Sequence, residues 1–453
     1  MMLKINIPKN PALAVKMLID SGFEAGVVGG CIRDALMNKI PHDWDICTSA
    51  TPDEIQSVFR DFKQLTVGLK HGTVVIFING EELEITTYRI DGIYSDGRRP
   101  DNVSFTRNLV EDLSRRDYTQ NAIFFNESVG IIDPFNGVSD IQHKIIRCVG
   151  DSNKRLKEDA LRILRGIRFA SNLDFTVEES TKTAMFRNKE LLINISKERI
   201  AVEFIKMLQG KNVMNTLDEF QEIISCIIPE IKAMIGFEQN NPYHCYDIWK
   251  HTLITVNNVE GLILRLTMFF HDIAKPNCYS IDKHGIGHFY GHADESAEIA
   301  SEIFKRMKLT NSESITKNDI KIVIELIKYH DIIINPQKKS VRKILSKLDG
   351  NIEQFQRLLS VKKADILAQN PDKVIIRLKE IDSIQKIFDE VVEENTCITL
   401  KNLAINGKDL IAIGVPPGKI IGEILNQLLE DVLAENLSNE KESLLTAAKK
   451  YNY

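Results

Sequence analysis

Two aspartates lie two residues apart in the stretch GGCIRDALMNKIPHDWDICT, which covers residues 29–48. Along an extended strand, residues i and i+2 project to the same side, so Asp43 and Asp45 would point together while Trp44 and Ile46 turn to the core. Two neighbouring carboxylates repel each other unless a cation lies between them, and oxygen ligands favour Mg²⁺. Taken alone, the pair is more typical of a solvated Asp-x-Asp at a strand end.

A glycine turn and an arginine precede these aspartates. Gly29 and Gly30 follow the apolar run AGVV and precede a predicted helix, so their N–H groups can approach a phosphate closely. Arg33 adds a planar fork of hydrogen-bond donors. Carboxylates, a glycine turn and an arginine together suit a nucleoside triphosphate whose phosphates are clamped during attack. The chain contains no GxxxxGK[ST] motif, which excludes a Walker-type loop.

The stretch VGGCIRDALMNKIPHDWDICTSATP resembles the first signature of class II tRNA nucleotidyltransferases, a family of CCA-adding enzymes and bacterial poly(A) polymerases. RRDYTQNA, residues 115–122, resembles the ribose and phosphate motif of that family. This resemblance implies contacts to the sugar and triphosphate from Arg116, Asp117 and Asn121. Gln120 stands where the family usually has an apolar residue.

A helix with one charged face is predicted over KEDALRILRGIRFA, residues 157–170. At about 100° per residue, Ala160, Ile163, Leu164 and Ile167 fall on one half of the helical wheel. The other half contains Glu158, Asp159, Arg162, Arg165, Gly166 and Arg168. A solvated, salt-bridged face is one interpretation. The stretch also resembles the EDxxR motif of the family, in which the aspartate and the arginine take the place of a template base, and Arg165 and Arg168 would reach the base or the phosphates.

The chemistry of Asp159 and Arg162 favours two of the four bases. A carboxylate only accepts hydrogen bonds, and a guanidinium only donates them. Cytosine and adenine each offer an exocyclic amine beside an unprotonated ring nitrogen, which matches this pair. Uracil and guanine present the opposite pattern, and each unsatisfied buried group costs about 1–3 kcal/mol. CTP and ATP are therefore the predicted substrates. The loop SDGRRPD, residues 95–101, resembles the flexible loop that accompanies addition of the terminal A.

Histidines and aspartates recur in the second half of the chain, within HTL, FFHDIAKP, FYGHADESA, IKYHDI and KKADILAQNP. Predicted helices separate them, so they can converge in a bundle around a metal. Their order resembles that of the HD phosphohydrolase domain. The resemblance implies a divalent transition metal on His251, His271, Asp272 and Asp365, with His292 and His330 as the additional histidines of two-metal members. Phosphatase or phosphodiesterase activity on 2′,3′-cyclic ends and a relic that only shapes RNA binding both remain open.

The 453 residues are too many for one hydrophobic core. Strand signals dominate up to about Cys148, and helical periods follow from about Leu156. We predict an α+β fold, with a mixed α/β head that contains a small antiparallel sheet and an all-helical remainder. The predicted parts are a nucleotidyltransferase head at 1–148, a neck with the base-recognition helix at 149–235, an HD body at 236–370 and a tRNA-binding helical tail at 371–453.

Composition and charge exclude several classes of protein. A net charge of −5 excludes a wholly basic nucleic-acid coat. The N-terminus has no signal-peptide pattern and no apolar run is long enough for a membrane span, so we expect a cytoplasmic protein without a membrane partner. Seven cysteines without CxxC spacing argue against a disulfide framework and a structural zinc cluster.

We therefore predict a CCA-adding tRNA nucleotidyltransferase. The RNA 3′-hydroxyl would attack the α-phosphate of CTP twice and then of ATP, with Mg²⁺ on Asp43 and Asp45. An A-adding enzyme or a poly(A) polymerase is one alternative, and an HD phosphohydrolase with a regulatory head is another. The expected partners are tRNA, CTP and ATP, and the oligomeric state stays open.

Overall fold

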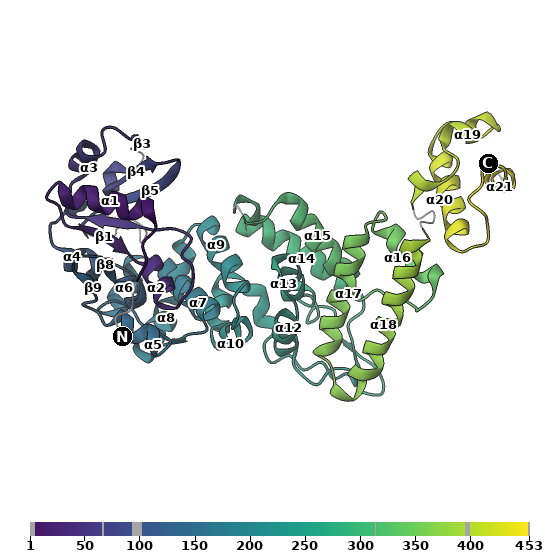
Figure 1. Ribbon diagram of the computed structural model, residues 1–453. Coiled ribbons are helices and arrows are strands. Elements are labelled where there is room, and N and C mark those ends of the chain that lie inside the picture. The colour runs from purple at the N-terminus through teal and green to yellow at the C-terminus, as the bar shows by residue number, and fades with distance from the viewer. Residues whose placement is uncertain (1–4, 66–67, 93–101, 313, 395–398, 452–453) are drawn as a thin grey trace. The chain divides into compact units, whose positions relative to one another are not determined.

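The computed structural model describes residues 5–65, 68–92, 102–312, 314–394 and 399–451 (Figure 1). The SDGRRPD loop, residues 95–101, lies outside these ranges. The chain divides into two compact units. The first contains Met1–Pro229 with Met307–Ser312, and the second contains Glu230–Arg306 with Glu313–Tyr453.

A seven-stranded sheet forms the core of the head, in the order β3-β4-β5-β2-β1-β8-β9. The strands are β1 (Ala25–Val28), β2 (Ile46–Thr48), β3 (Lys63–Leu65), β4 (Thr73–Ile78), β5 (Glu81–Thr87), β8 (Phe124–Asn126) and β9 (Gly130–Ile132). Neighbouring strands are antiparallel, except that β2 runs parallel to β5. Side chains along β4 alternate between the two faces of the sheet, and Val74, Ile76 and Ile78 are buried on one of them. This pattern is typical of a sheet with one covered face.

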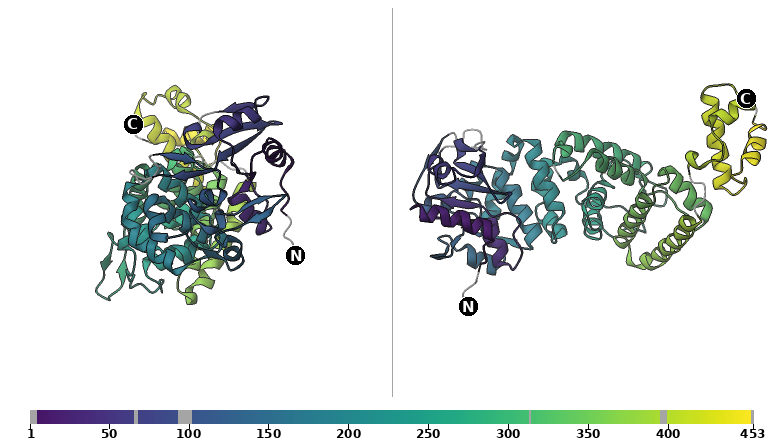
Figure 2. Two further views of the ribbon diagram at one scale, coloured as in Figure 1. Left: turned by 90° about the vertical axis from the view of Figure 1, so that its left-hand side faces the viewer. Right: turned by 45° about the horizontal axis from the view of Figure 1, so that its top comes forward.

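Short helices accompany this sheet (Figures 1 and 2). They are α1 (Lys9–Asp20), α2 (Gly30–Leu36), α3 (Pro52–Val58), α4 (Leu109–Ser114) and α5 (Gly137–Gln142). α3 begins with a capping box, because the Thr51 side chain accepts from Glu54 N while the Glu54 carboxylate accepts from Thr51 N. β6 (Arg89–Asp91) and β7 (Val103–Phe105) pair in antiparallel fashion.

Helices make up most of the rest of the first unit. They are α6 (Ser152–Glu158), α7 (Leu161–Leu173), α8 (Glu179–Asn188), α9 (Lys197–Leu208), α10 (Val213–Glu219) and α11 (Gln221–Ile227). The strands β10 (Ile145–Ile146) and β11 (Thr176–Val177) form a small parallel pair. The predicted apolar face of α7 is confirmed, because Ile163, Leu164 and Ile167 are fully buried.

The prediction of one continuous helix over residues 157–170 was wrong. α6 ends at Glu158, Asp159 is extended with φ −143° and ψ 104°, and α7 begins at Leu161. The Asp159 carboxylate accepts a hydrogen bond from Leu161 N at 3.0 Å. Aspartate competes with the helical backbone in this way, which favours a helix start over a helix interior.

The helical wheel was also wrong about Gly166, which it placed on the charged face. Gly166 is buried, and a Cβ at this position would stand 2.2 Å from the Tyr118 hydroxyl oxygen and 2.3 Å from Met185 Cε. The glycine therefore belongs to the packed side of α7, where it leaves room for Tyr118.

The second unit is a helical body with a helical tail (Figure 1). Its helices are α12 (Ile248–Asn257), α13 (Leu262–Phe270), α14 (His292–Met307), α15 (Lys317–Tyr329), α16 (Lys338–Lys347), α17 (Ile352–Leu367), α18 (Pro371–Glu393), α19 (Gly407–Ala412), α20 (Lys419–Leu433) and α21 (Lys441–Ala448). A short hairpin joins β12 (Ser280–Ile281) to β13 (Gly287–His288). The body and the tail have separate apolar clusters, the first around Phe355 and Phe388 and the second around Leu410 and Leu428.

The sequence also predicted that the chain has no membrane-spanning helix and no disulfide framework. Among the described residues, no helix is both long enough and apolar enough to cross a membrane. The six cysteines in the described ranges are free thiols, as their spacing predicted.

Candidate active site

A pocket of about 480 Å³ lies in the first unit, between the head sheet and helices α7 and α9. It brings together residues from four separate stretches of the sequence. Eleven of the predicted nucleotide-site residues line it, namely Gly29, Gly30, Arg33, Asp45, Arg116, Asp117, Asn121, Asp159, Arg162, Arg165 and Arg168. Two others stand outside its lining. Asp43 is exposed before β2, and Glu158 pairs with Arg162.

The turn before α2 requires glycine at position 29. Gly29 has φ +87°, and a Cβ there would lie 3.2 Å from an Arg116 guanidinium nitrogen. Gly29 N donates to Ile123 O at 3.1 Å, which ties the turn to the strand that follows Asn121. From the first turn of α2, Arg33 donates to Asn121 Oδ1 at 2.8 Å. The glycine turn and the RRD motif therefore form one wall of the pocket.

The paired aspartates lie in an extended segment directly before β2. Val28 N donates to Asp45 O at 2.9 Å, so the sheet pairing continues one residue beyond the strand. Trp44 and Ile46 are buried while Asp43 and Asp45 are exposed, which is the predicted alternation. Desolvation raises the pKa of Asp45, repulsion from Asp43 adds to this, and Arg116 opposes it.

A third carboxylate, Glu84, was missed by the sequence reasoning. β2 pairs with β5 in parallel, with Ile46 opposite Ile85, so the preceding residues Asp45 and Glu84 are neighbours across the sheet. Desolvation and then the charge of Asp45 raise the pKa of Glu84, and Asp43 contributes. The signal in the sequence was the alternation EELEITT, which turns Glu82 and Glu84 to the side opposite Leu83 and Ile85.

Asp117 is the most heavily bonded carboxylate in the pocket. It accepts from Tyr118 N at 2.8 Å, from Asn121 Nδ2 at 3.1 Å and from Arg165 Nε at 2.8 Å. Burial would raise the pKa of Asp117, but Arg165 and the Asn121 amide hold it well below its usual value. Asp117 therefore stays ionised and fixes Arg165 of α7 against the head.

The break between α6 and α7 places Asp159 and Arg162 beside each other in the pocket. Arg162 donates to Glu158 Oε2 at 2.8 Å, to Arg155 O at 3.0 Å and to Arg115 O at 3.2 Å. These three acceptors hold the guanidinium in one orientation, and the side chain is 11% exposed.

Arg199 of α9 was also missed. One of its guanidinium nitrogens lies 2.7 Å from Asp159 Oδ2, and the residue lines the pocket. It comes forty residues after Asp159, so no local pattern joins the two. The available signal was the i, i+4 pairing of Arg199 with Glu203 on one face of a predicted helix.

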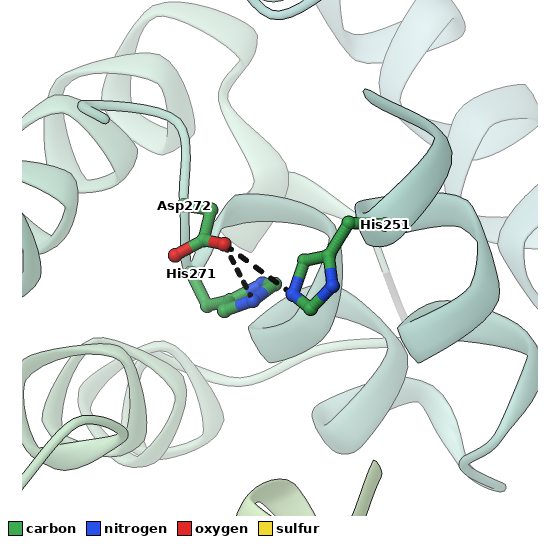
Figure 3. A group of neighbouring side chains, drawn as sticks. All are labelled: His251, His271 and Asp272. Carbon is green, nitrogen blue, oxygen red and sulfur yellow. Dashed lines mark ion pairs between the residues drawn. The ribbon is translucent and has the colours of Figure 1, made fainter. Parts of the chain in front are cut away.

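A second cluster of polar side chains lies in the second unit, in its buried interior (Figure 3). Asp272 is at its centre, directly after α13. Asp272 Oδ2 lies 3.1 Å from His271 Nε2 and 3.5 Å from His251 Nε2, while Oδ1 lies 3.5 Å from both His292 Nε2 and His330 Nε2. Asp365 of α17 completes the group, with His251 Nε2 at 3.0 Å. All six predicted residues are therefore neighbours.

The four imidazoles are oriented by the backbone. The Nδ1 atoms of His251, His271, His292 and His330 lie 2.7–3.1 Å from the carbonyl oxygens of Ala368, Met268, Phe289 and Ile327. A carbonyl oxygen only accepts, so each Nδ1 carries the proton and each Nε2 presents either a lone pair or a second proton to the cluster. Neutral rings would set these lone pairs against carboxylate oxygens, an arrangement that needs a positive charge at the centre.

The pKa values of the histidines also indicate that the cluster needs a positive charge at its centre. Burial alone would lower the pKa of His271, but Asp272 and Asp365 raise it to about 9. Burial lowers the pKa of His292 to about 4, so its ring is neutral at pH 7. Two trios, His251–His271–Asp272 and Asp272–His292–His330, place their ligand atoms close enough to hold a metal ion. A pocket of about 440 Å³ opens onto this cluster, and Lys275, Arg377 and Tyr290 contribute to its walls.

Known families match three stretches of the chain. The Poly A polymerase head domain matches residues 25–147. The RNA and SrmB-binding site of polymerase A matches residues 174–234, and tRNA nucleotidyltransferase domain 2 matches residues 305–448. The first match contains the glycine turn, the paired aspartates and the RRD motif.

Similar proteins cover almost the whole chain. The CCA-adding enzyme of Enterococcus faecalis is 32% identical over 443 residues, which are 98% of this chain and 96% of that protein. The CCA-adding enzyme of Ligilactobacillus salivarius is 35% identical over 456 residues, 98% of each. Among solved structures, the CCA-adding enzyme of Bacillus stearothermophilus in complex with CTP has a TM-score of 0.69 at 26% identity, over 98% of each chain. Together with the pocket geometry, these likenesses show that the chain belongs to the family of CCA-adding enzymes.

Proposed function

We propose that this chain adds C, C and A in turn to the 3′ end of tRNA, from CTP and ATP, with release of pyrophosphate. The RNA 3′-hydroxyl attacks the α-phosphate of the bound nucleotide. The observation that supports this most directly is the pocket, in which the paired-aspartate segment, the RRD motif and the base-reading residues meet. tRNA is the proposed partner and the cytoplasm the proposed location.

Asp43 and Asp45 are the proposed ligands of Mg²⁺, with Glu84 as a third carboxylate beside them. The residues fit such an ion, because hard oxygen donors are the ligands that Mg²⁺ prefers and their mutual repulsion leaves a place for a cation. When bound, Mg²⁺ supplies positive charge that acidifies the attacking hydroxyl and neutralises the phosphates. The raised pKa of Asp45 means that, before a cation binds, the pair gains its full negative charge at a higher pH than an isolated aspartate in water would.

The triphosphate is proposed to lie along the glycine turn. The N–H groups of Gly29 and Gly30 and the guanidiniums of Arg33 and Arg116 are the donors there. Asp117 and Asn121 are held together by a 3.1 Å hydrogen bond and are the proposed contacts to the sugar. These residues bind and orient the nucleotide, and the carboxylates beside β2 act on the reacting phosphate.

Base choice is proposed to lie with Asp159 and Arg162. Because α7 starts between them, both project from the same turn of chain toward the pocket. Asp159 accepts from the exocyclic amine of cytosine or adenine, and Arg162 donates to the neighbouring ring nitrogen. Arg199 lies 2.7 Å from Asp159 Oδ2, so an incoming base adds to that contact or replaces it.

Extension of a truncated tRNA tests this proposal. The purified chain is incubated with tRNA that lacks its CCA end and with CTP, ATP or both, and the 3′ ends are sequenced. We expect CC with CTP alone and CCA with both nucleotides. Addition of A only to a CC-ended tRNA would indicate an A-adding enzyme instead, and no extension in any arm would contradict both.

A second activity is proposed for the His/Asp cluster of the second unit. The buried convergence of four imidazoles on Asp272 favours a site for one or two divalent transition metals, because imidazole nitrogens suit those ions. Such a metal would activate a water molecule for hydrolysis of a phosphate ester. Lys275, 2.7 Å from Asp272 Oδ2, adds positive charge at the mouth of the cluster.

Metal analysis tests the second activity. His271→Ala with Asp272→Ala is expected to remove bound transition metal and hydrolysis of a 2′,3′-cyclic nucleotide. His284→Ala, at an exposed histidine that does not line this pocket, is the matched control and should keep both. Unchanged metal content in the double variant would refute the assignment. Bound metal without hydrolysis would assign the cluster to structure or RNA binding.

A further inference from the structure

Three guanidiniums gather around a single aromatic ring inside the nucleotide pocket. The Cζ atoms of Arg168, Arg33 and Arg165 lie 4.3, 5.3 and 5.5 Å from the ring centroid of Phe169. Phe169 is 7% exposed and lines the pocket. Arg33 comes from the first helix after the glycine turn, whereas the other two come from α7. The ring is therefore the point at which the two walls of the pocket meet.

Each guanidinium also has a polar partner besides the ring. Arg33 donates to Asn121 Oδ1 at 2.8 Å, Arg165 pairs with Asp117 Oδ2 at 2.6 Å, and Arg168 pairs with Glu203 Oε2 at 2.9 Å. Tyr118 packs edge-on against the ring, with a centroid separation of 5.9 Å. The polar contacts hold each guanidinium, and Tyr118 holds the ring, so the ring and the three cationic heads are kept close together.

Like charges at this separation repel. Each of the three has a carboxylate partner, and for Arg33 this is Asp34 at 2.8 Å, but the pocket as a whole has an excess of positive charge. Seven arginines and three aspartates line it. Burial lowers the pKa of Arg168, and Arg165 and Arg33 lower it further against the opposing effect of Glu203. The face of an aromatic ring is electron-rich and attracts cations, which offsets part of this repulsion.

We propose that Phe169 is a positioning residue for the triphosphate: its ring keeps Arg33, Arg165 and Arg168 converged on the pocket, ready for the phosphates. The proposal rests on the nucleotide site proposed above and adds a requirement for aromatic character at this position. A leucine would fill much of the same volume, but it has no quadrupole to hold the guanidiniums.

Binding of inorganic tripolyphosphate separates this role from base recognition and from catalysis. Titration calorimetry of the full chain with tripolyphosphate and with CTP is carried out on the unaltered protein, Phe169→Leu and Phe169→Tyr. We expect Phe169→Leu to weaken both ligands by about tenfold, equivalent to about 1.4 kcal/mol. Phe169→Tyr retains the ring and should stay within about threefold. In steady-state extension, Phe169→Leu should raise the KM for CTP while kcat at saturating CTP changes less than about twofold.

Phe175→Leu is the matched control, because Phe175 is also buried, follows the same helix and does not line the pocket. It should lower thermal stability as much as Phe169→Leu while leaving tripolyphosphate binding unchanged. Unchanged tripolyphosphate affinity in Phe169→Leu would overturn the proposal, as would an equal loss in Phe169→Tyr. If the unaltered chain binds neither ligand, the nucleotide site itself is refuted along with the role of Phe169.

Discussion

Asp159 combines a structural and a chemical task in one side chain. Its Oδ1 accepts from Leu161 N and starts α7, while its Oδ2 pairs with Arg199 at 2.7 Å. A carboxylate oxygen has two acceptor directions, so both contacts leave capacity for a base amine. The residue that begins the helix is thus already oriented toward the nucleotide that it is proposed to read.

Removal of the two carboxylates before β2 tests their proposed role in metal binding. Asp43→Asn with Asp45→Asn is expected to abolish transfer, because neutral amides neither hold nor charge-balance Mg²⁺. tRNA binding, measured by electrophoretic mobility shift, should persist. Asp61→Asn is the control, since the Asp61 side chain is 88% exposed on the surface. Extension by the double variant at the unaltered rate would contradict the assignment.

Selectivity among nucleotides tests Asp159. With Asp159→Ala, the preference for CTP and ATP over UTP and GTP should fall by about tenfold or more, since one hydrogen bond to a charged group contributes about 1.5–3 kcal/mol. Asp159→Asn keeps an acceptor for Leu161 N but presents a donor to the amine, so it should lose selectivity without the loss of stability. Retained preference in both variants, measured by competitive incorporation, would remove the base-reading role.

At the scale of elements, the break between α6 and α7 determines the geometry of the pocket. A continuous helix would have spread Asp159 and Arg162 along one face, whereas the break brings both to the start of α7. α7 then packs through Gly166 against Tyr118, whose hydroxyl donates to Arg162 O at 2.5 Å. The same contact secures the helix and the head against each other.

The close approach at Gly166 predicts a specific pair of stability effects. Gly166→Ala should destabilise the first unit by about 1–3 kcal/mol, because its Cβ would overlap the Tyr118 hydroxyl. Tyr118→Phe in the same chain removes that oxygen and should restore part of the loss. Gly422→Ala in α20 is the control, since no atom lies within 4 Å of the place that a Cβ would take there and the change should be neutral or stabilising. Chemical denaturation is measured for Gly166→Ala, Tyr118→Phe, their combination and Gly422→Ala; strictly additive effects at 118 and 166 would contradict the clash.

At the scale of the whole molecule, residues distant in sequence complete each unit. Met307–Ser312 belongs to the first unit although it follows α14 of the second. Leu309 is fully buried, and Lys308 Nζ lies 2.6 Å from Glu198 Oε1 of α9. In the second unit, the His/Asp cluster likewise draws its members from the ends of several helices.

Weaker packing of the segment Met307–Ser312 should destabilise the first unit. Leu309→Ala is expected to cost about 2–5 kcal/mol, because it leaves a cavity against α9. Hydrogen exchange in α9 should accelerate accordingly. Leu367→Ala, at a side chain that is 41% exposed, should leave α9 protection unchanged. Equal protection of α9 in the two variants would show that Leu309 contributes little.

Local sequence determined the chemical groups and their immediate orientation. The spacing of Asp43 and Asp45 placed both on one side because strand alternation has a period of two, and the buried Trp44 and Ile46 confirm it. The α+β class, the change from strands to helices and the family also followed from local pattern and motif order. Each of these depends on residues within one element or on their order along the chain.

Only the tertiary structure decided which groups meet. Arg199 and Phe169 reach the pocket through packing of α9 and the shared ring between α2 and α7. Glu84 comes beside Asp45 through the parallel pairing of β2 with β5. The break at Asp159 escaped the helical wheel because the wheel uses hydrophobic periodicity alone, whereas the Asp159 side chain accepts from Leu161 N and so favours a new helix start there. Hydrophobic periodicity predicts which face of a helix or strand a residue occupies. Contacts between segments distant in sequence determine what packs against that face.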